Sequence, residues 1–271
     1  DSQPWNFFLC LYDFQYDHYW HRLSFITKTK SKEKIIIMIG FYDYTVILTY
    51  LSLLSGISGV LVCLKGIGHP YLGMFFLLFS GLCDTFDGKV ARSKKDRTEQ
   101  AKRFGIQIDS LSDLVAFGVL PACIGIAMLR CSLEYTTLPN IHFIRLQEKP
   151  VFVQVVLTAI AALYVLAAMI RLAYFNVLEE EDQNRDANGE KIYLGLPVTS
   201  GALVFPAVLL LHVFVSADLT LLYFCVLIVM GFLFLSKIHI KKPQNREIAL
   251  MIAFGVFEFA ILAMILVFTK L

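Results

Sequence analysis

Charged residues are scarce in this sequence of 271 residues. Asp, Glu, Lys and Arg make up 17% of it, hydrophobic residues make up 57%, and the mean hydropathy is +0.66. A soluble domain of this length carries more charge and fewer unbroken apolar runs. A helix that spans a bilayer needs about 20 mostly apolar residues, and several such runs are present. We therefore exclude a soluble globular protein and expect one polytopic membrane domain.

Two further features are missing. No pair of cysteines has CxxC spacing, and most of the six cysteines lie within apolar runs. We interpret them as small core hydrophobes, not as a disulfide framework or a zinc site. The net charge is only +2, and we expect no nucleic-acid partner. The alternating pattern of an outer-membrane barrel is also absent, so the expected fold is an all-α membrane helix bundle.

The apolar runs predict six to eight transmembrane helices, of which we place seven. Their expected ranges are 43–64, 70–90, 106–129, 151–176, 197–216, 219–236 and 249–269. With the amino end inside, the outer segments hold five of the 24 Lys and Arg residues, which leaves 19 on the inner side. Because Lys and Arg accumulate in cytoplasmic loops, we expect the loops 92–104, 177–196 and 237–247 to face the cytoplasm.

The first 37 residues differ from the rest of the chain. They mix aromatic and polar residues, end in a lysine-rich stretch at 28–34, and show no clear signal-peptide pattern. Met38 opens a segment typical of the start of a membrane protein. We predict a poorly defined extension at 1–37 and a single membrane domain at 38–271. Whether the extension is native stays open; a native one would lie on the membrane surface.

The most informative pattern is formed by four aspartates. Asp84 and Asp87 are three residues apart, and Asp109 and Asp113 are four apart, so each pair shares one face of a helix. The first pair ends the second predicted span and the second pair begins the third. A hairpin through the basic loop 93–104 would bring both pairs to one depth near the cytoplasmic surface.

Four carboxylates in one pocket of low dielectric repel one another, and divalent cations relieve that repulsion. An all-oxygen ligand set favours Mg²⁺, Mn²⁺ or Ca²⁺ over zinc or copper. Two metal ions bridged by aspartates suit displacement at phosphorus, and Arg92 could supply a phosphate fork. The alternatives are that the acids cap helices, pair with nearby cations, or line the path of a cation transporter.

These residues carry a resemblance to a known family. The pattern D84-xx-D87-G88-xx-A91-R92…G105-xxx-D109-xxx-D113 resembles the signature of the CDP-alcohol phosphatidyltransferases, membrane enzymes that pass a phosphatidyl or related group from a CDP-linked donor to an alcohol. Twelve residues separate Arg92 from Gly105, a longer loop than is usual in the family. The extra residues fall in the basic loop, where added length costs little.

The resemblance implies roles for the residues of the signature. Asp84, Asp87, Asp109 and Asp113 would bind Mg²⁺ or Mn²⁺, as two ions, and Asp113 would also act as the general base. The donor CDP-diacylglycerol would be held by a second set of residues, namely Gly88, Ala91, Arg92 and Gly105. Membrane lipids would surround the site, and a homodimer is expected from the family.

Four further segments are similar to phosphatidylserine synthases of the bacterial membrane type. They are IDSLSDLVAFGVLPA at 108–122, RLAYFNV at 171–177, YLGLPVTSG at 193–201 and SKIHIKK at 236–242. The implied reaction transfers the phosphatidyl group to L-serine and releases CMP, in a bacterial cytoplasmic membrane. Glycerol phosphate or an inositol phosphate is the alternative acceptor, and Tyr174 stands where a basic residue is expected.

Three polar residues outside the signature need a role. Arg171 and Asn176 would lie at the cytoplasmic end of the fourth span, where both are candidates for binding the acceptor or a phosphate. Arg171 could bind the serine carboxylate or a donor phosphate, or it could anchor the helix by snorkelling. Glu258 lies inside the last apolar run. An acid at that depth is a candidate functional residue, and we expect it at a helix interface or a subunit contact.

Overall fold

The structure is a computed structural model. It describes residues 39–64, 70–94, 96–130, 150–180, 192–215, 219–241 and 245–268. The residues from Phe41 onward form one compact unit, within which the membrane helices lie. The extension predicted at 1–37 lies outside the described residues.

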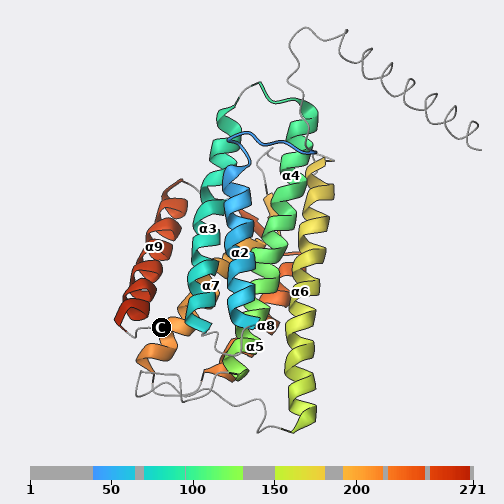
Figure 1. Cartoon of the computed structure of the whole chain (residues 1–271). Coiled ribbons are helices and arrows are strands. Elements are labelled where there is room, and N and C mark those ends of the chain that lie inside the picture. Colours follow the sequence, from blue (N-terminus) through green and yellow to red (C-terminus); the bar gives the residue numbers. More distant parts are fainter. Residues whose placement is uncertain are drawn as a thin grey trace, which may run out of the picture. The chain divides into compact units, whose positions relative to one another are not determined.

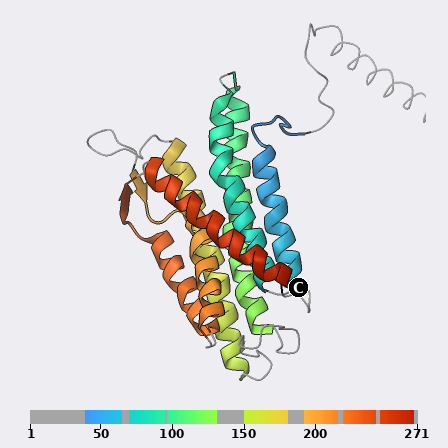
Figure 2. The ribbon, with the colours of Figure 1, turned by 90° about the vertical axis from the view of Figure 1, so that its left-hand side faces the viewer.

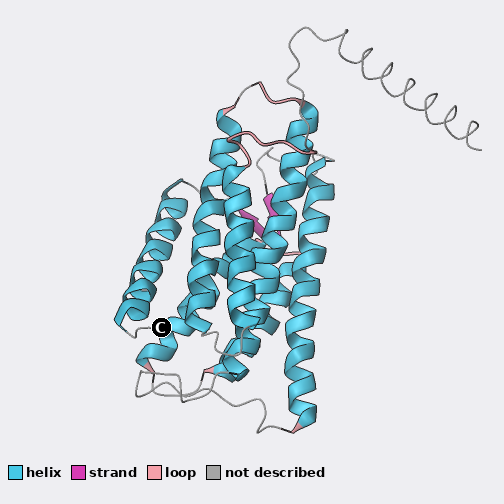
Figure 3. Cartoon of the chain, viewed as in Figure 1, coloured by secondary structure: helices cyan, strands magenta, loops and turns pink. Residues whose placement is uncertain are grey.

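Helices make up nearly all of the described chain (Figure 3). In chain order they are α2 (Ile47–Leu64), α3 (Pro70–Ser93), α4 (Glu99–Asp113), the π-helical turn η1 (Leu114–Val119), α5 (Leu120–Arg130), α6 (Val151–Glu180), the 3-10 turn η4 (Val198–Ser200), α7 (Gly201–Phe214), α8 (Thr220–Leu235) and α9 (Asn245–Phe268). The helices α2, α3, α4 and α6 run side by side (Figure 1). After a quarter turn, α9 is seen to cross the bundle obliquely (Figure 2).

Among the residues that the structure describes, four helical segments are long and apolar enough to cross a membrane. They are Ile47–Leu64, Glu99–Arg130, Val151–Glu179 and Arg246–Val267, and shorter apolar helices occupy Val198–Leu211 and Thr220–Leu235. The predicted all-α membrane fold is confirmed at this level, and the chain is an integral membrane protein. Each of the seven predicted spans overlaps one of the helices or, at 106–129, the continuous run from α4 through η1 to α5.

Small residues bring α2 close to α3 and to the run that follows. Ser52 and Ser80 each donate a hydrogen bond to the other's backbone carbonyl, at 3.3 and 3.0 Å. A side chain on Gly56 would meet the backbone of Ala116 at 3.0 Å, and one on Gly59 would meet Leu120 at 2.8 Å. Close packing of this kind replaces the hydrophobic drive that is absent between helices in lipid. It fixes α2 beside the helices that carry the aspartates.

The hairpin between α3 and α4 is shorter than the predicted loop 93–104. The helix α3 continues to Ser93 and α4 begins at Glu99, because the Thr98 hydroxyl accepts a hydrogen bond from the Ala101 N–H at 3.2 Å and caps α4. The Lys94 ammonium donates to the Asp43 carboxylate at 2.6 Å. The second aspartate pair therefore lies in the last turns of α4, inside the continuous run to α5, instead of at the start of a helix.

One feature was not predicted, a short antiparallel ladder between β1 (Ile192–Leu194) and β2 (His239–Lys241). Directly after β1, Gly195 has φ +73°, and its N–H donates to the Ile238 carbonyl at 2.8 Å. A side chain there would meet the Phe234 carbonyl oxygen at 2.8 Å, so the position requires glycine. The ladder ties the entry to α7 to the end of α8.

Candidate metal and phosphate site

Three of the predicted aspartates form a group. Asp84 comes from α3, and Asp109 and Asp113 come from successive turns of α4. One carboxylate oxygen of each lies within 4.8 Å of those of the other two. The α3–α4 hairpin thus brings residues 25 or more positions apart in the chain to one point, as the spacing predicts.

Asp87, the fourth aspartate, borders this group. It is buried, with 8% of its surface exposed, and it lies one helical turn after Asp84 on α3. The Thr49 hydroxyl of α2 donates to the Asp87 Oδ2 atom at 3.1 Å. One Asp87 oxygen is therefore oriented by a neighbouring helix, a common arrangement for a carboxylate that binds metal.

The residues of this group suit a hard divalent cation. All the available ligand atoms are carboxylate oxygens, which Mg²⁺ and Mn²⁺ prefer. Among the described residues, the buried Asp109 Oδ1 atom has no hydrogen-bond partner, although buried carboxylate oxygens normally have one. A bound cation would satisfy this atom and offset the repulsion among the acids.

Two polar links hold α4 in place beside its acids. The Ser112 hydroxyl donates to the Thr49 carbonyl oxygen of α2 at 3.2 Å. On the other side, the Asn176 amide of α6 donates to the Ser110 hydroxyl at 2.9 Å. Both serines are direct neighbours in sequence of the aspartates. The candidate acceptor residue Asn176 is thus engaged in helix packing, and it is not among the residues that line the cavity described next.

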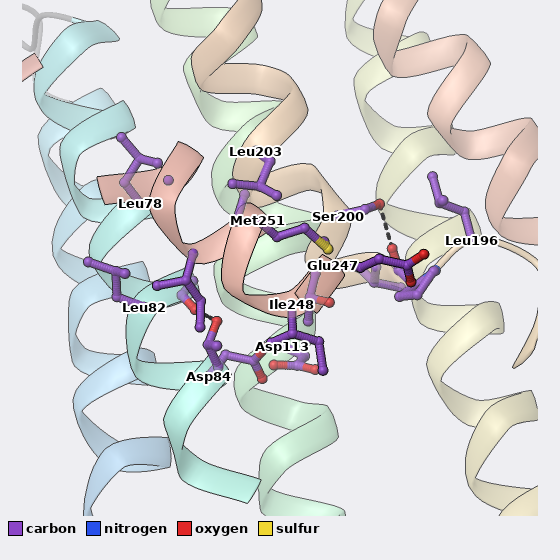
Figure 4. Close-up of a pocket in the computed structure, with 18 of the residues that line it drawn as sticks. Leu78, Leu82, Asp84, Asp113, Leu196, Ser200, Leu203, Glu247, Ile248 and Met251 are labelled. Atoms are coloured by element: carbon purple, nitrogen blue, oxygen red, sulfur yellow. Dashed lines mark hydrogen bonds between the residues drawn. The ribbon is translucent and has the colours of Figure 1, made fainter. Parts of the chain in front are cut away.

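A cavity of about 710 Å³ opens onto Asp84 and Asp113. Its lining also includes the hydroxyl residues Thr85, Thr199 and Ser200, and its apolar lining includes Leu78, Leu82, Leu203, Met251 and Ile252. In Figure 4, Leu78 and Leu203 lie on one side of the cavity while Asp84 and Asp113 lie on the other. One continuous space therefore joins an acidic site to an apolar chamber between α3, α7 and α9.

Arg171 lines the same cavity, as its predicted role requires. It is buried, with 6% exposure, and its guanidinium lies over the Phe175 ring at 5.1 Å from the centroid. This burial differs from that of a snorkelling anchor, whose charged head stays in water. Sequence reasoning missed a second charged residue here: Glu247, in the first turn of α9, is exposed and lines the cavity.

The structure describes only some of the side chains predicted to bind the CDP donor. Gly88 and Ala91 lie in the last turns of α3 and are not among the residues that line the cavity. The side chain of Arg92 lies outside the described part of the structure. Gly105 lies against Arg97, whose guanidinium nitrogen would be 2.7 Å from an added side chain. Arg97 also donates to the Ala101 carbonyl at 3.0 Å, so Gly105 makes room for this cation.

Two other candidates lie away from the acidic group. Tyr174 is 54% exposed on α6, so it does not replace a basic residue in the cavity. Glu258 is 1% exposed, and neither carboxyl oxygen has a hydrogen-bond partner among the described residues. Its neighbour Phe259 packs on Phe75 of α3, with ring centroids 4.7 Å apart. Glu258 is therefore buried within a single chain, at a helix interface.

Known proteins similar to this chain include enzymes that act on lipids. The CDP-diacylglycerol–serine O-phosphatidyltransferase of Mycobacterium tuberculosis is 29% identical over 155 residues, 57% of this chain and 44% of the relative. The yeast Saccharomyces cerevisiae enzyme of the same name is 31% identical over 165 residues, 57% and 50% of the two chains. An archaetidylserine synthase of Methanothermobacter thermautotrophicus is 33% identical over 153 residues, 56% and 52%.

The chain thus spans about half the length of the curated relatives it matches. A family model covers far more of it. The model described as CDP-alcohol phosphatidyltransferase matches residues 45–269, which include all four aspartates and every helix from α2 to α9. This chain belongs to the CDP-alcohol phosphatidyltransferase family.

Proposed function

We propose that this protein transfers the phosphatidyl group of CDP-diacylglycerol to the hydroxyl of L-serine, which yields phosphatidylserine and CMP. The observation that carries the proposal is the cavity that joins Asp84 and Asp113 to an apolar chamber. A lipid-linked nucleotide has the same two parts, a charged pyrophosphate and acyl chains. The names of the relatives support serine as the acceptor.

The four aspartates would have two roles, metal binding and proton transfer. Asp84, Asp109 and Asp113, with Asp87 beside them, would hold Mg²⁺ or Mn²⁺ as two ions, which when bound would neutralise the pyrophosphate and stabilise the leaving CMP. Asp113 would take the proton of the serine hydroxyl as that oxygen attacks the lipid-linked phosphorus. The bond from phosphorus to the CMP oxygen breaks, and the electron pair leaves with CMP. Gly88, Ala91, Arg92 and Gly105 would hold the nucleotide.

The charges of the cavity match serine better than a phosphate acceptor. Serine carries a carboxylate and an ammonium group, and the cavity offers Arg171 and Glu247 as groups of opposite sign. A guanidinium binds a carboxylate through paired hydrogen bonds, whereas the Glu247 carboxylate would repel the dianion of glycerol phosphate or an inositol phosphate. Arg171 and Glu247 would therefore select the acceptor.

The proposal includes a position in the membrane, which rests on the distribution of Lys and Arg along the chain. We infer seven transmembrane spans with the aspartates facing the cytoplasm, since that orientation leaves 19 of the 24 Lys and Arg residues inside. Serine would then arrive from the cytoplasm while the acyl chains stay in the leaflet. A bacterial cytoplasmic membrane and a homodimer remain parts of this proposal, and residues 38–271 would form its single domain.

The decisive experiment is release of CMP by the purified protein. With CDP-diacylglycerol and Mn²⁺ or Mg²⁺, we expect CMP only when serine is added. Asp113→Asn should reduce turnover by about 10² to 10⁴-fold and leave donor binding largely intact. Arg171→Gln and Glu247→Gln should each raise KM for serine while KM for the donor stays unchanged. Release with glycerol phosphate but not with serine would refute the acceptor, and metal flux into liposomes without CMP release would indicate a transporter.

A further inference from the structure

The helix that carries Asp109 and Asp113 changes its winding directly after Asp113. Residues Leu114–Val119 form a π-helical turn between α4 and α5, and the Leu120 N–H donates to the Val115 carbonyl five residues back. A π turn holds one residue more than an α turn, and single π turns are frequent at functional sites. One extra residue rotates the aspartates by about 100° relative to α5.

A proline one turn further on leaves a carbonyl of this turn without its usual donor. In an α-helix the Phe117 carbonyl would accept from the N–H of residue 121, but that residue is Pro121, which has none. The Tyr164 hydroxyl of α6 donates to the Phe117 carbonyl at 2.7 Å. Tyr164 is 2% exposed, so no water replaces it. In a membrane interior, an unsatisfied carbonyl is costly because no water is present to donate to it.

The π turn is also closely seated on α6 and α2. A side chain on Gly118 would meet the Ala168 Cβ atom of α6 at 3.3 Å and the Leu114 Cδ1 atom at 3.1 Å. On the opposite side, Ala116 lies against Gly56 of α2, with 3.0 Å to an added side chain. The π turn is therefore in close contact with α6 on one side and with α2 on the other.

From this geometry we infer that Tyr164 is a positioning residue for the acidic site: by bonding to the Phe117 carbonyl, it holds the π turn that aims Asp109 and Asp113 toward Asp84. The inference rests on the proposed function, since it assigns these carboxylates to metal. Tyr164 lies on a different helix and is not among the residues that line the cavity. Its effect on the aspartates would be transmitted through the winding of the helix.

The test compares two tyrosine variants of the full chain in nanodiscs by Mn²⁺ binding, measured by electron paramagnetic resonance without substrate. Removing a group that supports metal ligands typically weakens metal binding by 10 to 100-fold, so for Tyr164→Phe we expect a Kd for Mn²⁺ about 10-fold higher. The matched control is Tyr223→Phe. Its hydroxyl donates to the Pro121 carbonyl at 2.8 Å and is equally buried, but that bond lies beyond the π turn, so binding should not change.

A second pair of variants moves the same turn without removing a hydrogen bond. Gly118→Ala should weaken Mn²⁺ binding because its side chain presses on Ala168 of α6, and adding Ala168→Gly should restore part of the affinity. Mn²⁺ binding by Tyr164→Phe at the wild-type Kd, or equal losses in Tyr164→Phe and Tyr223→Phe, would overturn the positioning role. Failure of the wild-type protein to bind Mn²⁺ would instead contradict the proposed metal site itself.

Discussion

Asp113→Asn should stabilise the protein while it removes the activity. Asn keeps the shape of Asp and removes one negative charge from a group whose oxygens lie within 4.8 Å of one another. At that distance and an effective dielectric of 20, two unit charges repel by about 3 kcal/mol. The gain should be smaller than this, because the carboxyls of the metal-free protein can take up protons or move apart. In EDTA we therefore expect the Asp113→Asn variant to unfold a few degrees above the wild type.

Bound metal should reverse the order of the two unfolding temperatures. A ligand that binds only the folded state stabilises it by about 2.7 kcal/mol at 100 times its Kd. Mn²⁺ should therefore raise the unfolding temperature of the wild type, and it should raise that of Asp113→Asn less, because Asp84, Asp87 and Asp109 remain to bind the ion. Thermal unfolding in detergent, with EDTA or with Mn²⁺, measures both effects.

The control for these measurements is Glu258→Gln, which alters a buried acid outside the group and should keep the full response to Mn²⁺. If Asp113→Asn unfolded below the wild type in EDTA and gained as much from Mn²⁺, Asp113 would not belong to a repulsive metal-binding group.

Two further predictions concern the frame around the site. Burial raises the pKa of Asp43, but hydrogen bonds from Lys94 and Thr45 outweigh this and leave it below its ordinary value; its contribution to stability is therefore present above about pH 4 and lost as the pH falls through the lowered pKa. In the Asp43→Asn variant, the free energy of unfolding should therefore fall less as the pH is lowered below about 4. Because Lys94 and Asp43 form a partly exposed pair, the substitution should cost at most about 1 kcal/mol at pH 7. Gly195→Ala should destabilise the chain by about 1 to 3 kcal/mol in chemical denaturation, because φ is +73° and the new side chain would meet the Phe234 carbonyl oxygen; a variant as stable as the wild type would show that this turn is not held in the left-handed region.

The acidic group could be predicted from the sequence because its determinants are local. Spacings of three and four residues place each pair on one helix face, and a hairpin must return the second pair to the depth of the first. The same reasoning located Arg171 at the level of the site. The basic composition of the stretch after α3 predicts a loop, which places the start of α4 too late, because Thr98 supplies a helix cap within that stretch.

Contacts between distant segments could not be predicted in this way. Glu247 reaches the cavity only because α9 crosses the bundle obliquely (Figure 2), and a crossing angle leaves no periodic signal in a single sequence. The sequence places Asn176 beside Arg171 at the end of the fourth span, which makes it a candidate for binding the acceptor. Its hydrogen bond with Ser110 depends on the rotation of α6, which is set by packing along the whole helix.

The π turn shows how one added residue changes the direction in which the side chains before it point. Pro121 is a visible signal that one carbonyl near residue 117 loses its donor, yet a proline in an apolar run equally predicts a kink or a helix end. The outcome here depends on Tyr164, which lies 47 residues from Phe117 and brings a hydroxyl to that carbonyl. With this bond the helix continues, with one residue added between Asp113 and α5. The direction in which the carboxylates point is thus determined by a tyrosine on another helix, beyond the signature by which the site is recognised.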